Sequence, residues 1–391
     1  MRILFVTHET SRTGAPGILL YFIRWLRENR KDIKFDLLAL QEGPLLTDMR
    51  AACDHTYVWN RRSTRGGIDK VIMRVFFHLS RLTIRWKIRN ARYDLVYVNS
   101  AASCHVLDAI RSDMGDARLL VHVHELEVTL QRFCKRATEK WLHQADCVVG
   151  VSNLVIDNLI QNHGVPQAVI HKVHEFIPDS NVDVEQARED IRATYGIPKQ
   201  AVLIGGCGTL DWRKGPDLFI QVAKMILEST EGDTEFHFLW MGGKPGTRAW
   251  VELHHDLRQC GIIDRVQFVG LVANASDFFH AFDMFLMPSR EDPFPLVCLE
   301  AGQAGCPIVC FKDAIGSTEY LSDKTGAVVP YLDTSAMANE TWRLSMNEEE
   351  RERAGREIRD AVRPFTLETC ATKLIDIIEE LVQFDVRGEE R

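Results

Sequence analysis

The feature that most constrains the fold is an alternation of short β-rich runs with longer segments of helical spacing, from end to end of the chain. The strands predicted in the first half are residues 3–6, 35–40, 56–59, 95–98, 119–124 and 147–151. Those predicted in the second half are residues 202–206, 236–241, 266–269, 284–287 and 308–311. Strands that alternate with helices predict βαβ units and parallel sheets. The sequence therefore predicts an α/β fold.

A chain of 391 residues is too long for one typical core, so two domains are expected. A polar, proline-containing stretch at residues 177–183 marks the break between them. We therefore predict an N-terminal domain at 1–180 and a C-terminal domain at 181–365. The helical pattern in the last segment, 366–391, is expected to cross back to the first domain.

Composition excludes several classes of protein. With 46% hydrophobic and 26% charged residues the chain is globular and not disordered. It has no run of 18 apolar residues, so no membrane-spanning helix is expected. The apolar part of residues 1–8 is too short for a secretory signal and is more typical of a first strand.

Metal ligands are not gathered in any recognisable pattern. The ten cysteines are scattered without a Cys-x-x-Cys pair, which is typical of buried free thiols in a reducing cytoplasm. No Asp-x-Asp triplet is present, which argues against a diphosphate held through Mg²⁺ or Mn²⁺. We predict neither a metal nor a cofactor.

The segment 283–301 carries the clearest candidate site. A short apolar strand leads into a Pro-Phe-Pro turn and then the start of a helix, where free N–H groups and the helix dipole favour phosphate. Asp292 and Glu300 bracket this turn, and carboxylates accept hydrogen bonds from hydroxyl groups. Phosphate donors flanked by hydroxyl acceptors indicate a nucleotide-sugar site.

Two glycine-containing loops follow predicted strands. The first, at residues 13–17, is a weak signal for phosphate by itself. The second, at 205–215, ends in Arg213 and Lys214 just before a helix. These two cations are suited to clamping a diphosphate, and the alternative is a solvated pair at a loop tip.

A pair of histidines lies at the end of a predicted strand in the first half. His122 and His124 point the same way if the strand continues, and His124 lies at its tip. Ligands of open parallel sheets bind at the carboxyl ends of the strands. His124 is therefore a site candidate, with a purely structural histidine as the alternative.

The residues from 61 to 92 are strongly basic. This segment has ten basic residues and one acid and therefore carries a charge of +9. The rest of the chain carries −17, which gives the net charge of −8. Its apolar residues recur roughly at helical spacing, which predicts a basic amphipathic helix. Such a helix favours an anionic membrane surface. The alternative is a helix packed on the first domain with its charges in solvent.

Four features in this order resemble the GT-B glycosyltransferases, specifically the large retaining family 4. They are the loop Thr13-Gly-Ala-Pro16, a strand-end His124, Lys214-Gly215 before a helix, and the Asp292–Glu300 element. The resemblance covers almost the whole chain. It implies two Rossmann-like, doubly wound parallel-sheet domains that face a central cleft, with the donor held mostly by the second domain.

The resemblance also implies roles for residues of the second domain. Glu300 would bind the ribose hydroxyls and Asp292 the hydroxyls of the sugar. Backbone N–H groups of three residues would face the sugar and the phosphates: Phe294, Leu296 and Val297. Arg213 and Lys214 would neutralise the diphosphate.

In the first domain, Gly14 and Ala15 would approach the donor, and His124 would lie beside the transferred sugar. Two positions depart from the family pattern. Asp292 stands where glutamate is usual, and Thr209 stands where the family has a phosphate-binding arginine. We expect Arg213 to take over that role.

The implied activity is a metal-independent transfer of a hexose from a nucleotide-diphosphate sugar to a hydroxyl of a glycan or lipid-linked acceptor, with the anomeric configuration retained. Cell-surface polysaccharide or lipopolysaccharide biosynthesis is the expected setting. The basic segment 61–92 suggests a cytoplasmic enzyme, peripheral on the inner face of the membrane. Nucleic acid is not an expected partner. A GT-B enzyme of other chemistry, such as a nucleotide-sugar epimerase, and a catalytically silent glycan- or nucleotide-binding subunit remain alternatives.

Overall fold

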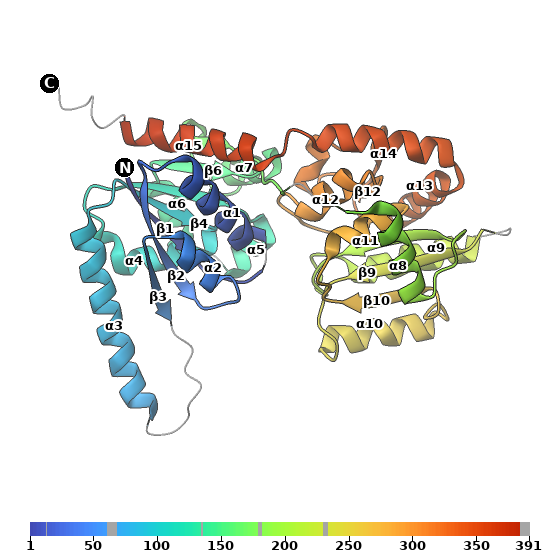
Figure 1. Ribbon diagram of the computed structural model, residues 1–391, viewed down its shortest axis with the longest axis horizontal. Coiled ribbons are helices and arrows are strands. Elements are labelled where there is room, and N and C mark those ends of the chain that lie inside the picture. The colour runs from blue at the N-terminus through green and yellow to red at the C-terminus, as the bar shows by residue number, and fades with distance from the viewer. Residues whose placement is uncertain (13, 61–68, 134–135, 179–181, 230–233, 384–391) are drawn as a thin grey trace. The chain divides into compact units, whose positions relative to one another are not determined.

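The computed structural model describes residues 1–12, 14–60, 69–133, 136–178, 182–229 and 234–383 (Figure 1). The chain divides into two compact units. Unit 1 contains Met1–Phe176 and Leu367–Arg391, and unit 2 contains Ile177–Thr366. No helix within the described ranges combines the length and the apolar character that crossing a bilayer requires.

Unit 1 is built on a parallel sheet with the strand order β3-β2-β1-β4-β5-β6-β7. Its described strands are β1 (Arg2–Thr7), β2 (Lys34–Gln41), β3 (His55–Asn60), β4 (Leu95–Asn99), β5 (Arg118–Val123), β6 (Cys147–Gly150) and β7 (Ile170–Lys172). The central strands β1, β4 and β5 are buried almost throughout. Strands buried on both faces are typical of a sheet covered by helices on both sides.

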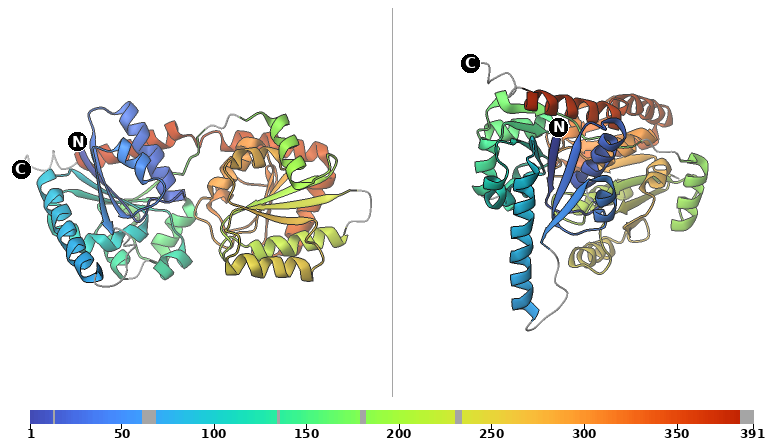
Figure 2. Two further views of the ribbon diagram at one scale, coloured as in Figure 1. Left: turned by 60° about the horizontal axis from the view of Figure 1, so that its bottom comes forward. Right: turned by 60° about the vertical axis from the view of Figure 1, so that its left-hand side comes forward.

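Helices cover both faces of this sheet (Figures 1 and 2). The described α-helices of unit 1 are α1 (Gly14–Asn29), α2 (Leu46–Ala52), α3 (Asp69–Ala91), α4 (Leu107–Ile110), α5 (Glu127–Phe133), α6 (Arg136–Gln144), α7 (Asn153–Gln161) and α15 (Leu367–Gln383). Ser152 caps α7 by accepting from the Val155 N–H, as a serine before an apolar helix favours.

Aromatic rings join the first elements of unit 1. The Phe5 ring on β1 makes edge-to-face contacts with Phe22 on α1, Phe35 on β2 and Tyr97 on β4, at centroid distances of 6.1, 5.9 and 5.2 Å. Each ring is almost fully buried. This geometry adds to the free energy of burying the rings and fixes the position of β1 at the centre of the sheet.

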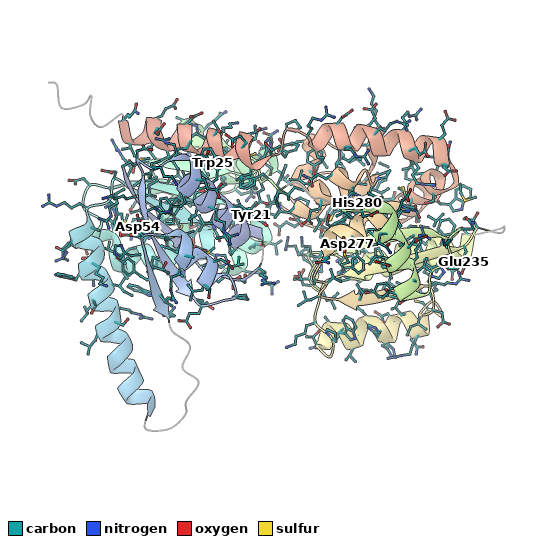
Figure 3. All side chains as sticks on the ribbon, viewed as in Figure 1. Tyr21, Trp25, Asp54, Glu235, Asp277 and His280 are labelled. Atoms are coloured by element: carbon teal, nitrogen blue, oxygen red, sulfur yellow. The ribbon has the colours of Figure 1, made fainter. Side chains whose placement is uncertain are left out.

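The last helix, α15, packs on α1 in unit 1. Trp25 on α1, which is labelled in Figure 3, donates its Nε1–H to Glu368 Oε2 at 2.6 Å. Arg30 pairs with Glu379. The apolar face of α15, which includes Leu374 and Ile378, is buried.

Unit 2 is also built on a parallel sheet, with the strand order β10-β9-β8-β11-β12-β13. Its described strands are β8 (Val202–Cys207), β9 (Phe236–Met241), β10 (Val266–Gly270), β11 (Met284–Met287), β12 (Ile308–Phe311) and β13 (Gly326–Val329). Its described helices are α8 (Val184–Tyr195), α9 (Pro216–Ser229), α10 (Arg248–Gln259), α11 (Ala275–Ala281), α12 (Leu296–Ala304), α13 (Thr334–Met346) and α14 (Glu348–Val362). The two sheets confirm the predicted pair of doubly wound α/β folds.

Each sheet has one point at which the strand order reverses. In unit 1 it lies between β1 and β4, and in unit 2 it lies between β8 and β11. The loops that leave two such strands diverge to opposite faces, so their carboxyl ends form a crevice where ligands of open α/β sheets bind. The topology therefore indicates the loops after β1, β4, β8 and β11 as candidate sites.

Candidate functional site

In unit 2, the loop after β8 is joined closely to the loop after β11. Gly215 has a φ of +71°, and a Cβ at this position would lie 2.2 Å from the Pro288 carbonyl oxygen. Only glycine combines this left-handed backbone with such a close approach. The Arg290 N–H donates to the Arg213 carbonyl oxygen at 2.8 Å. The two loops are thus held in a fixed register by their own backbones.

Asp292 gathers both predicted cations. Lys214 Nζ donates to Asp292 Oδ2, and Arg213 Nη1 lies 3.6 Å from the same oxygen. The side chains of Asp292 and Lys214 are only 7% and 14% exposed. The structure therefore brings Arg213, Lys214 and Asp292 together, as the sequence led us to expect of a charged site.

The backbone of Asp292 is fixed by a further loop. Its N–H donates to the Ala314 carbonyl oxygen at 2.8 Å, and its carbonyl accepts from the Gly316 N–H at 3.0 Å. Arg213 also donates Nη1–H to the Glu291 carbonyl oxygen at 3.1 Å. A carboxylate held in this way can exchange its cation for a ligand hydroxyl without backbone movement.

Helix α12 begins directly after this turn. Pro295 precedes its first residues, Leu296 and Val297, whose N–H groups lie in the first turn, where an α-helix supplies no carbonyl partner. The Phe294 ring is buried against the rings of Tyr320 and Phe365. Phe294 thus anchors the turn through its side chain.

Glu300 lies one turn further along α12. Burial raises the pKa of its carboxyl group to about 7. Burial is the main cause that raises the pKa of the Cys207 thiol, at the end of β8, to about 12, and the negative charge of Glu300 raises it further. The positive charge of Lys214 lowers the pKa of the same thiol. Glu300 therefore belongs to the same edge of the sheet as Lys214.

In unit 1, His124 follows the last residue of β5 and is only 4% exposed. Its Nδ1 lies 2.7 Å from Glu175 Oε1, and its Nε2 lies 3.0 Å from Asn99 Oδ1. Asn99, the last residue of β4, also donates its side-chain N–H to the Ala15 carbonyl oxygen at 3.0 Å. The structure thus connects the predicted residues Ala15 and His124 through a residue that the sequence analysis had not selected.

Gly14 begins α1 at the carboxyl edge of the same sheet. Among the described residues, no heavy atom lies within 4 Å of the position that a Cβ would take here. The glycine is therefore not required by packing inside unit 1, and its open face is available to a ligand.

The neighbouring His122 has a structural role. It is buried, its Nδ1 contacts the Tyr97 hydroxyl, and burial lowers its pKa well below the usual value.

Sequence reasoning missed Asn99, Glu175 and the Arg290–Asp217 pair. Arg290 donates to both carboxylate oxygens of Asp217, at 3.0 and 2.7 Å, and this pair ties the start of α9 to the loop after β11. Asn99 could have been found because it directly follows the predicted strand 95–98. Glu175 carries no local signal, since its partner is 51 residues away in the sequence.

Comparisons with known proteins agree with this architecture. A family model described as "Glycosyltransferase Family 4" matches residues 19–180, and one described as "Glycosyl transferases group 1" matches residues 201–347. Two sugar-transferase domains, each on a doubly wound sheet, define the GT-B class of glycosyltransferases. This chain belongs to that class, as a member of the family 4 type.

Individual relatives are distant. A D-inositol 3-phosphate glycosyltransferase from Xylanimonas cellulosilytica is 27% identical over 250 residues, which cover 61% of this chain and 58% of the relative. A mannosylfructose-phosphate synthase from Agrobacterium fabrum is 30% identical over 176 residues, which cover 42% of this chain and 37% of the relative. The chain thus spans little more than half the length of the first of these relatives.

Among solved structures, Anabaena Alr3699/HepE in complex with UDP-glucose is similar to this chain with a TM-score of 0.78 at 18% identity. The match covers 97% of this chain and all of the other. At this identity the likeness establishes the shared fold.

Proposed function

We propose that this protein transfers a hexose from a nucleotide-diphosphate sugar to a hydroxyl group of an acceptor, with the anomeric configuration retained. The observation that supports this proposal most directly is the convergence of Arg213, Lys214 and Asp292 beside the start of α12. Two cations, free N–H groups and a carboxylate suit a diphosphate joined to a polyol. The complex of HepE with UDP-glucose adds support for a donor of this kind.

The roles follow from charge and geometry. Lys214 and Arg213 stabilise the charge that grows on the diphosphate as the glycosidic bond breaks. Leu296 and Val297 offer N–H groups to the same oxygens. Asp292 exchanges Lys214 for hydroxyls of the sugar, and Glu300 binds the ribose.

The proposed reaction needs no metal ion, because the cationic pair supplies the positive charge. The bond between C1 of the sugar and the phosphate oxygen breaks, and a bond from C1 to the acceptor oxygen forms on the same face. The acceptor's hydroxyl proton passes to the departing phosphate oxygen, which becomes the leaving nucleoside diphosphate. The contribution of the protein is positioning and charge stabilisation.

A donor panel tests this proposal. Melting temperature is measured with UDP, GDP, ADP and dTDP and their hexose conjugates, since a ligand that binds only the folded state raises it. The stabilising donor is then incubated with acceptor sugars and lipid-linked acceptors, with EDTA present and absent. We expect transfer that EDTA does not abolish. Conversion of the donor sugar without an acceptor would instead identify an epimerase, and binding without turnover would identify a silent subunit.

We further propose that the acceptor is lipid-linked and that unit 1 meets an anionic membrane through α3. This helix extends beyond the sheet of unit 1 in two views (Figures 1 and 2). Leu79, Leu82 and Trp86 share one face and are 56, 46 and 65% exposed. Ile84 and Ile88, on the opposite face, are buried. The helix therefore has an apolar stripe in solvent.

Contacts with the rest of unit 1 hold the inward face of α3 in place. Arg85 and Arg89 both pair with the buried Asp113, and Arg81 contacts Asn60. These contacts oppose rotation of α3 about its axis, so the apolar stripe of Leu79, Leu82 and Trp86 stays on the side that faces solvent. An exposed tryptophan on a segment of +9 charge is suited to the interface of an anionic bilayer, where each well-placed basic residue contributes about 1 kcal/mol.

Binding to an anionic membrane through α3 would place the enzyme at the inner face of the cytoplasmic membrane, where it would act in the assembly of cell-surface polysaccharide or lipopolysaccharide. Co-sedimentation with liposomes, with and without anionic lipid, tests it. We expect binding that requires anionic lipid, weakens with salt, and is lost in Leu82→Ala/Trp86→Ala. The matched control is Trp342→Ala, which removes a 40% exposed tryptophan from unit 2. Equal binding by all three proteins would contradict the assignment to α3.

A further inference from the structure

The His124 ring is engaged at both nitrogens. Nδ1 lies 2.7 Å from Glu175 Oε1, and Nε2 lies 3.0 Å from Asn99 Oδ1. The His124 and Glu175 side chains are 4% and 7% exposed, so this contact is largely removed from water. Both partners lie far away in sequence, on β4 and in the segment after β7.

The direction of one hydrogen bond is fixed by its neighbour. A carbonyl oxygen only accepts, so the Asn99 group that faces the Ala15 carbonyl at 3.0 Å is the N–H₂. The amide oxygen of Asn99 therefore faces His124. It can only accept, and so Nε2 of His124 carries a hydrogen.

The charge of the ring depends on the state of Glu175, which faces Nδ1. An ionised carboxylate only accepts, so beside it Nδ1 must carry a hydrogen. With Nε2 already protonated, a hydrogen on Nδ1 makes the ring an imidazolium paired with an ionised Glu175. A charge-assisted hydrogen bond of this kind is stronger than a neutral one, which offsets the cost of burying the charges.

The other titratable groups that interact with the ring include Glu125, His122 and His8. The Glu125 carboxylate accepts from the Ser100 hydroxyl and from the backbone N–H groups of Ala101 and His124. The His122 ring lies 4.1 Å away, centre to centre, and burial lowers its pKa. Glu175 is therefore the acid that directly contacts the His124 ring.

We propose that Glu175 and Asn99 are positioning residues that hold His124 as a doubly protonated ring at the carboxyl edge of the unit 1 sheet. The inference rests on the proposed transfer reaction for its consequence. A ring that is protonated at both nitrogens contributes positive charge to the reaction but has no lone pair to act as a base, so the acceptor proton must go elsewhere.

The substitution Glu175→Gln should remove the positive charge of the His124 ring while the orientation of the ring is kept. The glutamine amide donates to Nδ1 and keeps the ring in place, but the ring loses its second proton. We expect kcat to fall about 10- to 100-fold while KM for the donor stays within about twofold, since geometry and charge at the reacting centre act mainly on turnover. Glu127→Gln is the matched control, because it removes the charge of a glutamate that contacts a different histidine of the same unit, with Glu127 Oε2 2.8 Å from His163 Nε2.

A double-mutant cycle and a spectrum complete the test. In a His124→Ala background, Glu175→Gln should lower kcat no further, whereas an equal loss of kcat in both backgrounds would overturn the proposal.

In protein labelled with ¹⁵N-histidine, the ring of His124 should show two N–H signals, and the same ring should show one signal in Glu175→Gln. A single signal in the unchanged protein would also overturn it. The spectrum does not depend on activity, so it decides the state of the ring even if the proposed transfer reaction fails.

Discussion

Lys214 donates a hydrogen bond to Asp292 across 78 residues of sequence, and both side chains are largely buried. One of the two cations assigned to the diphosphate is thus held by the carboxylate assigned to the sugar. Under the proposed roles, donor binding replaces this contact by two others, from phosphate to Lys214 and from sugar hydroxyls to Asp292.

Replacing Lys214 should affect turnover strongly. We expect Lys214→Ala to lower kcat by at least about 100-fold, the scale of losing one strong electrostatic stabiliser. Lys224→Ala is the control, since Lys224 forms only an exposed contact with Glu228, at 3.6 Å, on α9. Steady-state kinetics on folded protein measure both. Unchanged turnover in Lys214→Ala would reject the cationic clamp.

Removing the charge of Asp292 should affect the binding of two ligands to different extents. Asp292→Asn frees Lys214 and Arg213 from a competing carboxylate, so a nucleoside diphosphate should bind on the order of tenfold more tightly. That factor corresponds to about 1.4 kcal/mol, within the range of a hydrogen bond to a charged group. The sugar-bearing donor should gain less, because its hydroxyls lose an acceptor. Calorimetric titration with both ligands measures the difference, and an equal change for the two would contradict the assigned roles.

Glu300 should make stability depend on pH. Its pKa is raised by burial from 4.5 to about 7 in the folded state. The folded protein therefore keeps a proton that the unfolded chain releases, and the stability from the neutral carboxyl is present below about pH 4.5 and lost as pH rises through 7. The total is about 3 kcal/mol. Denaturant titrations from pH 5 to 8 should show this decline, and it should be much smaller in Glu300→Gln.

The same carboxyl group should couple donor binding to proton release. Ribose hydroxyls donate to the ionised form, so binding favours ionisation and affinity should rise with pH up to about 7. Calorimetry in two buffers of different ionisation enthalpy counts the released protons at pH 6.5. Glu300→Gln should release fewer protons and bind the nucleotide more weakly.

Gly215 should tolerate no side chain. Gly215→Ala places a Cβ against the Pro288 carbonyl in a left-handed backbone conformation, so it should cost more than the roughly 1–2 kcal/mol of that conformation alone. Gly196 is the control, because it has a similar φ of +67° at the end of α8 with no described heavy atom within 4 Å of its Cβ position. Unfolding free energies of the two variants should therefore differ, with Gly215→Ala the less stable.

Much of the fold was predictable because its signals are local. The apolar run of β1 and the helical spacing of α1 each depend on residues a few positions apart, and their alternation predicts parallel sheets. Asp292 and Glu300 were found for the same reason, since the turn and the helix start between them are contiguous. The outward face of α3 was not predictable, because the helical spacing of Leu79 and Trp86 does not say which side of the helix meets the sheet.

The sequence by itself determined the elements, their order, and the charged groups at the strand ends after β8 and β11. Only the tertiary structure decided which of these groups meet. Glu175 and Asn99 contact His124 because the strand order places the ends of β4 and β5 side by side and returns the chain to them after β7. Hydrogen bonds act over about 3 Å, whereas their partners in this protein are separated by 25 and 51 residues, so their pairing is a property of the folded sheet.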